Sequence, residues 1–303
     1  MLSRIIQFIF FANYFVGFLA VALSVETVFQ LSLPLASPAY YILLFAATVL
    51  YYTYAYSGAA TSPASQNPRT EWYRTHRSFT RLTQIVFLCI CILSAGFLLY
   101  QYLPSILSLP IYYWILLVSI PIAALLYYGL LPSSFNLRNT GWLKAFVIGF
   151  VWAGSVNFIP VTMAHIQYGV EVAQPDFMLW LFLKNWMFCT VNAIMFDIKD
   201  YEDDSNRQLK TFVVRFGLYQ TIFFVIIPLL LVGIISLLIF THFKNFSAVV
   251  IGINLIPFLS LLYVAYALQQ PKKILYYLIV IDGLLLLKAI CGIAGIMLLR
   301  TLS

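Results

Sequence analysis

The chain has 303 residues, of which 63% are hydrophobic and only 9% are charged. Soluble globular domains are about 45–50% apolar and about 25% charged, so this sequence lacks the polar surface that a soluble protein of its length requires. The long continuous apolar runs also exclude the alternating pattern of an outer-membrane barrel. We therefore expect an all-α polytopic membrane protein in which residues 1–303 form a single transmembrane domain.

Nine apolar runs are long enough for a bilayer-crossing helix, which needs about 20 residues. In chain order they cover residues 5–33, 38–57, 82–102, 110–131, 143–162, 176–196, 218–240, 246–268 and 275–299. The first run is longer than the apolar core of a signal peptide, about 7–15 residues, so we interpret it as a retained span. Prolines mark several of the breaks, where turns are favoured. Nine spans would place the two termini on opposite sides of the membrane.

The basic residues indicate the orientation of these spans. Thirteen of the seventeen would lie on the side of the N-terminus, and only Lys244 and Arg300 on the other side. The thirteen are Arg4, Arg69, Arg74, Arg77, Arg81, Arg138, Lys144, Lys199, Arg207, Lys210, Arg215, Lys272 and Lys273. Because cytoplasmic loops carry the excess of basic residues, the N-terminus is predicted to be cytoplasmic and the C-terminus to lie opposite, in the cell (inner) membrane. The net charge of +7 is thus explained without a nucleic-acid partner.

Half of the ten acidic residues gather directly after the sixth predicted span, between positions 197 and 204. If the helix continues into this stretch, Asp197, Asp200 and Asp204 fall on one face, at positions i, i+3 and i+7. Carboxylates so close together repel one another unless a cation lies between them, and Mg²⁺ prefers oxygen ligands that include substrate phosphate. Basic residues nearby could bind phosphate oxygens. The stretch predicts a cytoplasmic-face site for a metal-bridged diphosphate, although a solvated acidic loop is the alternative.

The same stretch, DIKDYEDDSNRQLKTFVVRFG, resembles the second aspartate-rich motif of the UbiA superfamily of membrane prenyltransferases. In that family the pattern is D-x-x-D-x-x-x-D, followed by Gly-x-Lys/Arg-Thr, a short apolar run and Gly. Asp197, Asp200 and Asp204 match the acids, and Lys210 and Thr211 match the basic residue and threonine. The family's first glycine is replaced here by glutamine.

A second stretch, NTGWLKAFVIGFVWAG at residues 139–154, resembles the loop and fifth helix of the same family, with Lys144 and Trp152 in the expected places. The resemblance implies a UbiA-type bundle of nine helices with a cavity on the cytoplasmic side. It also implies that Mg²⁺ is bound by the three matched aspartates, which are then the catalytic residues. Lys144 and Lys210 are implied to bind the diphosphate of a prenyl diphosphate, whose isoprenoid group passes to a hydrophobic acceptor within the bilayer.

The first aspartate-rich motif of the family is missing. Its place after the second predicted helix reads YYTYAYSGAATSPASQNPRTEWYRTHR, where Glu71 is the only acid. Asn67 and Pro68 predict a helix start there, with Asn as the N-cap. Arg74, Arg77 and Arg81 would then share one face of that helix. Such a face could grip the diphosphate in place of a metal, since arginine suits phosphate well; alternatively it only fixes topology or contacts lipid headgroups.

Two further function classes stay open. Because half of the family's acidic clamp is missing, the chain could be a catalytically degenerate relative that binds an isoprenoid or a membrane partner. A transporter is the third possibility, since charged residues within spans are costly and usually functional. Those residues are Glu26, Lys184, Asp282 and Lys288. Asp282 and Lys288 are six residues apart, so we expect them on different faces and not paired with each other.

Overall fold

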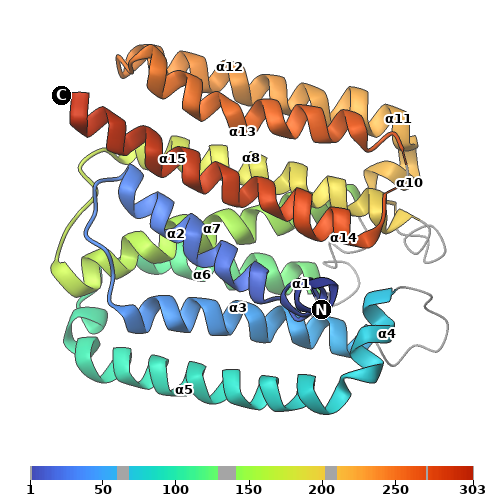
Figure 1. The fold of residues 1–303 in the computed structure, drawn as a ribbon. Coiled ribbons are helices and arrows are strands. Elements are labelled where there is room, and N and C mark those ends of the chain that lie inside the picture. The colour runs from blue at the N-terminus through green and yellow to red at the C-terminus, as the bar shows by residue number, and fades with distance from the viewer. Residues whose placement is uncertain (1, 60–67, 129–140, 202–209, 271, 303) are drawn as a thin grey trace.

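The computed structural model describes residues 2–59, 68–128, 141–201, 210–270 and 272–302, and within these ranges the chain is helical and contains no strand. The long helices lie side by side in one bundle (Figure 1). In chain order the elements are α1 (Leu2–Phe11), α2 (Tyr14–Gln30), α3 (Pro38–Ala59), α4 (Pro68–Thr75), α5 (Arg77–Leu107), α6 (Ile111–Tyr128), α7 (Gly141–Tyr168), α8 (Pro175–Lys199), α10 (Phe212–Phe216), α11 (Leu218–Thr221), π-helix η3 (Ile222–Ile226), α12 (Ile227–Phe243), α13 (Ala248–Ala267), α14 (Ile274–Tyr276), π-helix η4 (Tyr277–Ile281) and α15 (Asp282–Leu302).

The apolar helices confirm a multi-pass membrane protein. Six described helices are long and apolar enough to cross a membrane, or seven if the bent pair α1 and α2 is one span. Each of the nine predicted runs coincides with helix over most of its described length. The α6 helix contributes only a shorter apolar segment, and α3 is not among the six. The count of nine spans therefore stays a prediction.

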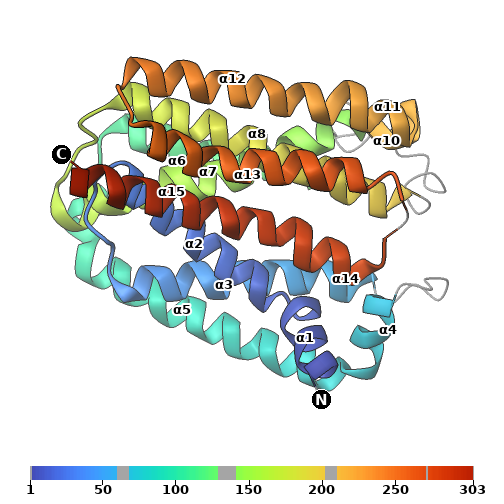
Figure 2. The same ribbon diagram turned by 45° about the horizontal axis from the view of Figure 1, so that its top comes forward.

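The first predicted span, residues 5–33, is not one straight helix. Its two parts, α1 and α2, meet at an angle of 62°. Asn13 lies at the break in the left-handed conformation, with φ of 65°, which asparagine tolerates better than most residues. The α1 helix therefore runs at an angle to α2, as Figure 2 shows, and its Phe8 packs against Trp72 of α4 and Phe79 of α5.

The predicted helix that would carry three arginines on one face is also broken. It begins at Pro68, as expected, but α4 ends at Thr75 and α5 starts at Arg77. Arg74 therefore lies on a different helix from Arg77 and Arg81. The shared arginine face is wrong because the periodicity argument assumed one continuous helix.

The two ends of the bundle differ in charge. The N-terminus lies at the end where α4, α10 and α14 are found, and the C-terminus lies at the opposite end (Figure 1). Basic residues of α4, of the first turn of α7, of the last turn of α8 and of α10 lie at the former end. This arrangement agrees with the predicted separation of basic residues, while the assignment of that end to the cytoplasm stays a prediction.

The centre of the bundle is the close packing of α7 against α8. Gly149 makes it possible, because a Cβ atom there would collide with the Thr190 hydroxyl and lie 2.8 Å from the Thr190 backbone nitrogen. Small residues at helix interfaces allow such close approach in membranes. By contrast, α5 covers the outside of the bundle, and large apolar side chains such as Leu93 are exposed on it. Lipid chains would cover this exposed apolar surface in a membrane.

Candidate functional site

A cavity of about 190 Å³ opens into the bundle between α2, α3, α4, α7, α8, η4 and α15. Most of its lining is apolar or aromatic. The charged side chains among its described lining residues are Arg69, Lys144, Asp197, Asp200 and Asp282. They come from four separate helices, so helix packing alone brings them together. The cavity includes the last turn of α8 and the first turn of α7, which places it near the end of the bundle that carries the N-terminus.

Two acids of the predicted aspartate stretch line this cavity. The Lys144 ammonium donates to Asp197 Oδ1 at 2.7 Å, across the α7–α8 interface. Asp200 lies one turn further, and its Oδ1 is 2.7 Å from Lys199 Nζ. The Asp197 side chain is buried, whereas Asp200 is partly exposed. Each acid therefore has a lysine beside it.

The structure describes two of the three predicted acids, Asp197 and Asp200. The α8 helix ends at Lys199, and Asp200 is its C-cap residue, with φ of −93° and ψ of 10°. Asp197 therefore lies in the last turn of α8 and Asp200 directly follows it. Asp204 lies outside the described residues.

Arg69 provides a second positive charge in the lining of the cavity. It is 3% exposed, and its guanidinium carbon lies 3.7 Å above the ring of Tyr56. Its Nε and Nη2 donate to the Phe11 carbonyl at 3.3 Å and 3.1 Å, and Nη2 also donates to Asn13 Oδ1. Tyr73 donates to the same Phe11 carbonyl at 2.9 Å, and burial raises the pKa of its hydroxyl, which therefore stays protonated. These contacts form at the break between α1 and α2, and the sequence alone does not show them.

The other predicted diphosphate-binding residues do not line the cavity. Arg74, Arg77, Arg81 and Lys210 are all exposed and absent from its described lining. Arg74 instead forms a 3.5 Å ion pair with Glu71. Of the predicted set, the structure brings only Lys144 to the acids.

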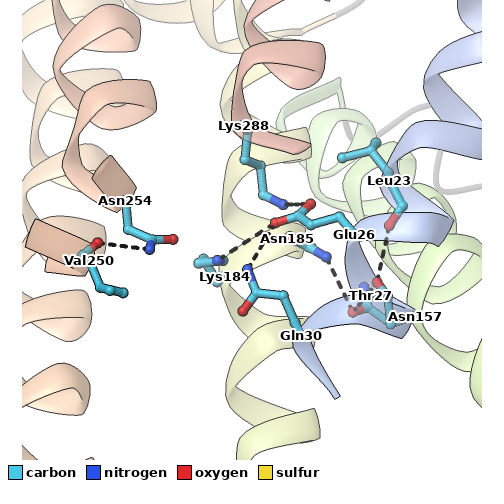
Figure 3. Close-up of polar contacts among 10 residues, drawn as sticks. All are labelled: Leu23, Glu26, Thr27, Gln30, Asn157, Lys184, Asn185, Val250, Asn254 and Lys288. Carbon is cyan, nitrogen blue, oxygen red and sulfur yellow. Dashed lines mark hydrogen bonds and ion pairs between the residues drawn. The ribbon is translucent and has the colours of Figure 1, made fainter. Parts of the chain in front are cut away.

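A second charged cluster lies deep in the bundle, away from the cavity lining (Figure 3). Lys288 Nζ lies 2.6 Å from Glu26 Oε2, and Lys184 Nζ lies 3.9 Å from Glu26 Oε1. Gln30 donates to Glu26 Oε1 at 3.3 Å. All four side chains are buried. The expectation that Asp282 and Lys288 are not paired agrees with this geometry, since Lys288 pairs with Glu26.

The architecture and the cavity define a class of protein, namely an intramembrane helical bundle with a charged cavity near one end. A sequence model of the UbiA prenyltransferase family matches residues 65–280, more than two thirds of the 303-residue chain. The chain therefore belongs to the UbiA prenyltransferase family. No curated protein and no solved structure matches it.

Proposed function

We propose that this protein transfers an isoprenoid group from a prenyl diphosphate to a hydrophobic acceptor within the membrane. One observation supports this most strongly. One cavity contains Asp197 and Asp200 together with two cations, Arg69 and Lys144, and most of its remaining lining is apolar or aromatic. The charged part suits a diphosphate and the apolar part suits an isoprenoid chain.

The acids fit one Mg²⁺ ion better than two. Within the described parts of the chain, no three His, Cys, Asp or Glu residues are grouped as a metal site. Mg²⁺ is often bound through only one or two carboxylates together with substrate phosphates and water. Asp197 and Asp200 would provide these carboxylates, and we propose Asp204 as a third ligand. Bound there, Mg²⁺ would neutralise charge on the departing diphosphate.

We assign the remaining diphosphate contacts to Arg69 and Lys144. Both line the cavity, whereas Arg74, Arg77 and Arg81 are absent from its described lining. Arginine forms strong charge-assisted hydrogen bonds to phosphate. Arg69 would therefore supply part of the positive charge that a metal ion at the missing first motif would otherwise provide.

The aromatic lining suits the reaction that follows. When the carbon–oxygen bond of the prenyl diphosphate breaks, its electron pair leaves with the diphosphate and an allylic cation remains. The rings of Tyr52, Tyr56 and Trp152 line the cavity, and Trp152 Nε1 donates to Tyr52 at 2.6 Å, which fixes both rings. Aromatic faces attract a cation. The acceptor then forms the new bond and loses a proton.

A second candidate function is isoprenoid binding without turnover. It is supported by the two ion pairs at the cavity, since Asp197 and Asp200 each lie 2.7 Å from a lysine. Mg²⁺ would have to displace Lys144 and Lys199 from these carboxylates. A site neutralised in this way could bind an isoprenoid without any metal.

Purified protein, radiolabelled prenyl diphosphates of several lengths and a panel of hydrophobic acceptors distinguish the two functions. We expect Mg²⁺-dependent diphosphate release and a labelled lipid product. Removing Mg²⁺ with a chelator or substituting Asp197→Asn should abolish both, whereas Asp176→Asn, at the other end of α8, should not. Tight isoprenoid binding with no diphosphate release under any of these conditions would exclude the enzyme and leave the binding protein.

A further inference from the structure

A third carboxyl group lines the cavity and has no part in the diphosphate site. Asp282 begins α15 directly after the π-helix η4 and is 9% exposed. Within the described residues its carboxylate forms no hydrogen bond and no ion pair, although the charges of Arg69 and Lys199 act on it. π-helical turns inside α-helices frequently occur at functional sites. A buried carboxylate inside a membrane protein is costly, so a function is the default explanation.

Asn192 also lines the cavity, and it contacts the residue that precedes Asp282. Its Nδ2 donates to the carbonyl of Ile281 at 3.2 Å, in the turn that precedes Asp282. A carbonyl can only accept, so this bond fixes the orientation of the Asn192 amide. Its Oδ1 is buried and has no hydrogen-bond partner within the described chain. Buried oxygens without partners are uncommon and call for an explanation such as a ligand.

The two side chains lie deeper than the diphosphate site. Asn192 precedes Asp197 by five residues on α8, which is about 7.5 Å along the helix axis. The bond to Ile281 places the start of α15 at the same depth. A diphosphate at Asp197 would therefore leave Asp282 and Asn192 beside the carbon end of the substrate, where the acceptor must approach.

The Asp282 carboxylate and Asn192 Oδ1 both accept hydrogen bonds, and neither has a donor among the described residues. The group that fits between them is therefore a hydrogen-bond donor. We infer that Asp282 and Asn192 form a subsite for an acceptor that carries a hydroxyl group, and that Asp282 takes the proton that the acceptor loses. The inference rests on the proposed function. The bond from the prenyl carbon to the diphosphate breaks, the bond from that carbon to the acceptor forms, and the acceptor's proton passes to a carboxylate oxygen of Asp282.

Binding of a naphthol and of its O-methyl ether to the full-length protein tests the subsite without turnover. The two probes have similar size, but only the naphthol has a donor. We expect the protein to bind the naphthol about 10-fold more tightly, as for one hydrogen bond to a charged group. Asp282→Leu and Asn192→Leu should each reduce this preference, whereas Asn254→Leu, on α13 outside the cavity lining, should keep it. Equal affinity for both probes in the unaltered protein would overturn the subsite.

Transfer of the prenyl group to a hydroxyl-bearing acceptor tests the proton step. Asp282→Asn should lower the rate of prenyl transfer about 100-fold, which is the usual scale of general-base catalysis. The affinity for prenyl diphosphate should change by no more than about 2-fold, which corresponds to about 0.4 kcal/mol. Transfer that persists in Asp282→Asn would remove the inference and leave the proposed function. Absence of transfer in the unaltered protein, together with a naphthol preference that depends on Asp282, would remove the proposed function and keep the subsite. Thermal unfolding of each variant shows whether it is folded.

Discussion

Lys288 Nζ lies 2.6 Å from Glu26 Oε2, although 262 residues of chain separate them. The pair joins α15 to α2, and both side chains are buried. Removing one partner of a buried ion pair typically costs about 3–5 kcal/mol, because the other charge is left buried. We therefore expect Lys288→Met to lower the free energy of unfolding by about 3 kcal/mol.

Thermal unfolding in detergent measures this loss, with Lys244→Met as the control. Lys244 forms its 3.0 Å pair with Asp176 at an exposed position, where ion pairs contribute at most about 1 kcal/mol. The double substitution Glu26→Gln with Lys288→Met should recover only part of the stability, because Lys184 then loses the carboxylate that lies 3.9 Å from it. A Lys288→Met protein as stable as the control would show that the cluster does not hold α15 in place.

The affinity for prenyl diphosphate should depend on Arg69 and not on Arg77. Arg69 lines the cavity, while Arg77 is exposed outside it. We expect Arg69→Gln to weaken prenyl diphosphate binding roughly 10- to 100-fold, the scale of hydrogen bonds to a charged group, and Arg77→Gln to leave it nearly unchanged. Binding of the corresponding prenyl alcohol is the control, since an equal loss for the alcohol would mean that Arg69 acts only by holding α1 and α4 together.

Replacing Asp282 and Asp197 by leucine should change stability in opposite directions. Asp282 is buried without an ion pair among the described residues, so Asp282→Leu should raise the unfolding free energy by about 1 kcal/mol. Asp197→Leu removes the 2.7 Å partner of Lys144 and should lower it. Midpoints of thermal unfolding compare the two variants, and a fall for Asp282→Leu as large as that for Asp197→Leu would indicate a structural role for Asp282.

Gly149→Ala should loosen the centre of the bundle. The added methyl group would collide with Thr190 on the facing helix α8. Forcing extra volume into a packed core costs about 1–3 kcal/mol. The matched control is Gly252→Ala in α13, where a Cβ meets nothing within 4 Å, and which should be neutral or slightly stabilising because alanine favours helix. Equal unfolding midpoints for the two variants would contradict the packing argument.

Cysteine labelling tests the orientation in the membrane. In a variant without native cysteines, we expect Thr75→Cys and Tyr201→Cys to react only from the cytoplasmic side. Ser108→Cys, after α5 at the other end of the bundle, should react only from the opposite side. The expectation follows from the thirteen-to-two distribution of basic residues. Reaction of Thr75→Cys and Tyr201→Cys from different sides would overturn the topology.

The sequence alone determined the helical membrane class and the separation of basic residues. It also singled out Asp197 and Asp200, the two neighbouring aspartates that line the cavity. These features depend on local hydropathy and on residues close together in one helix, which a single sequence shows directly. The tertiary structure decided that Arg69 lines the same cavity as the acids and that Lys288 pairs with Glu26. It also placed Asn192 beside the turn before Asp282. Each of these relationships joins different helices, and side chains on different helices meet only through packing, which periodicity along one helix does not encode.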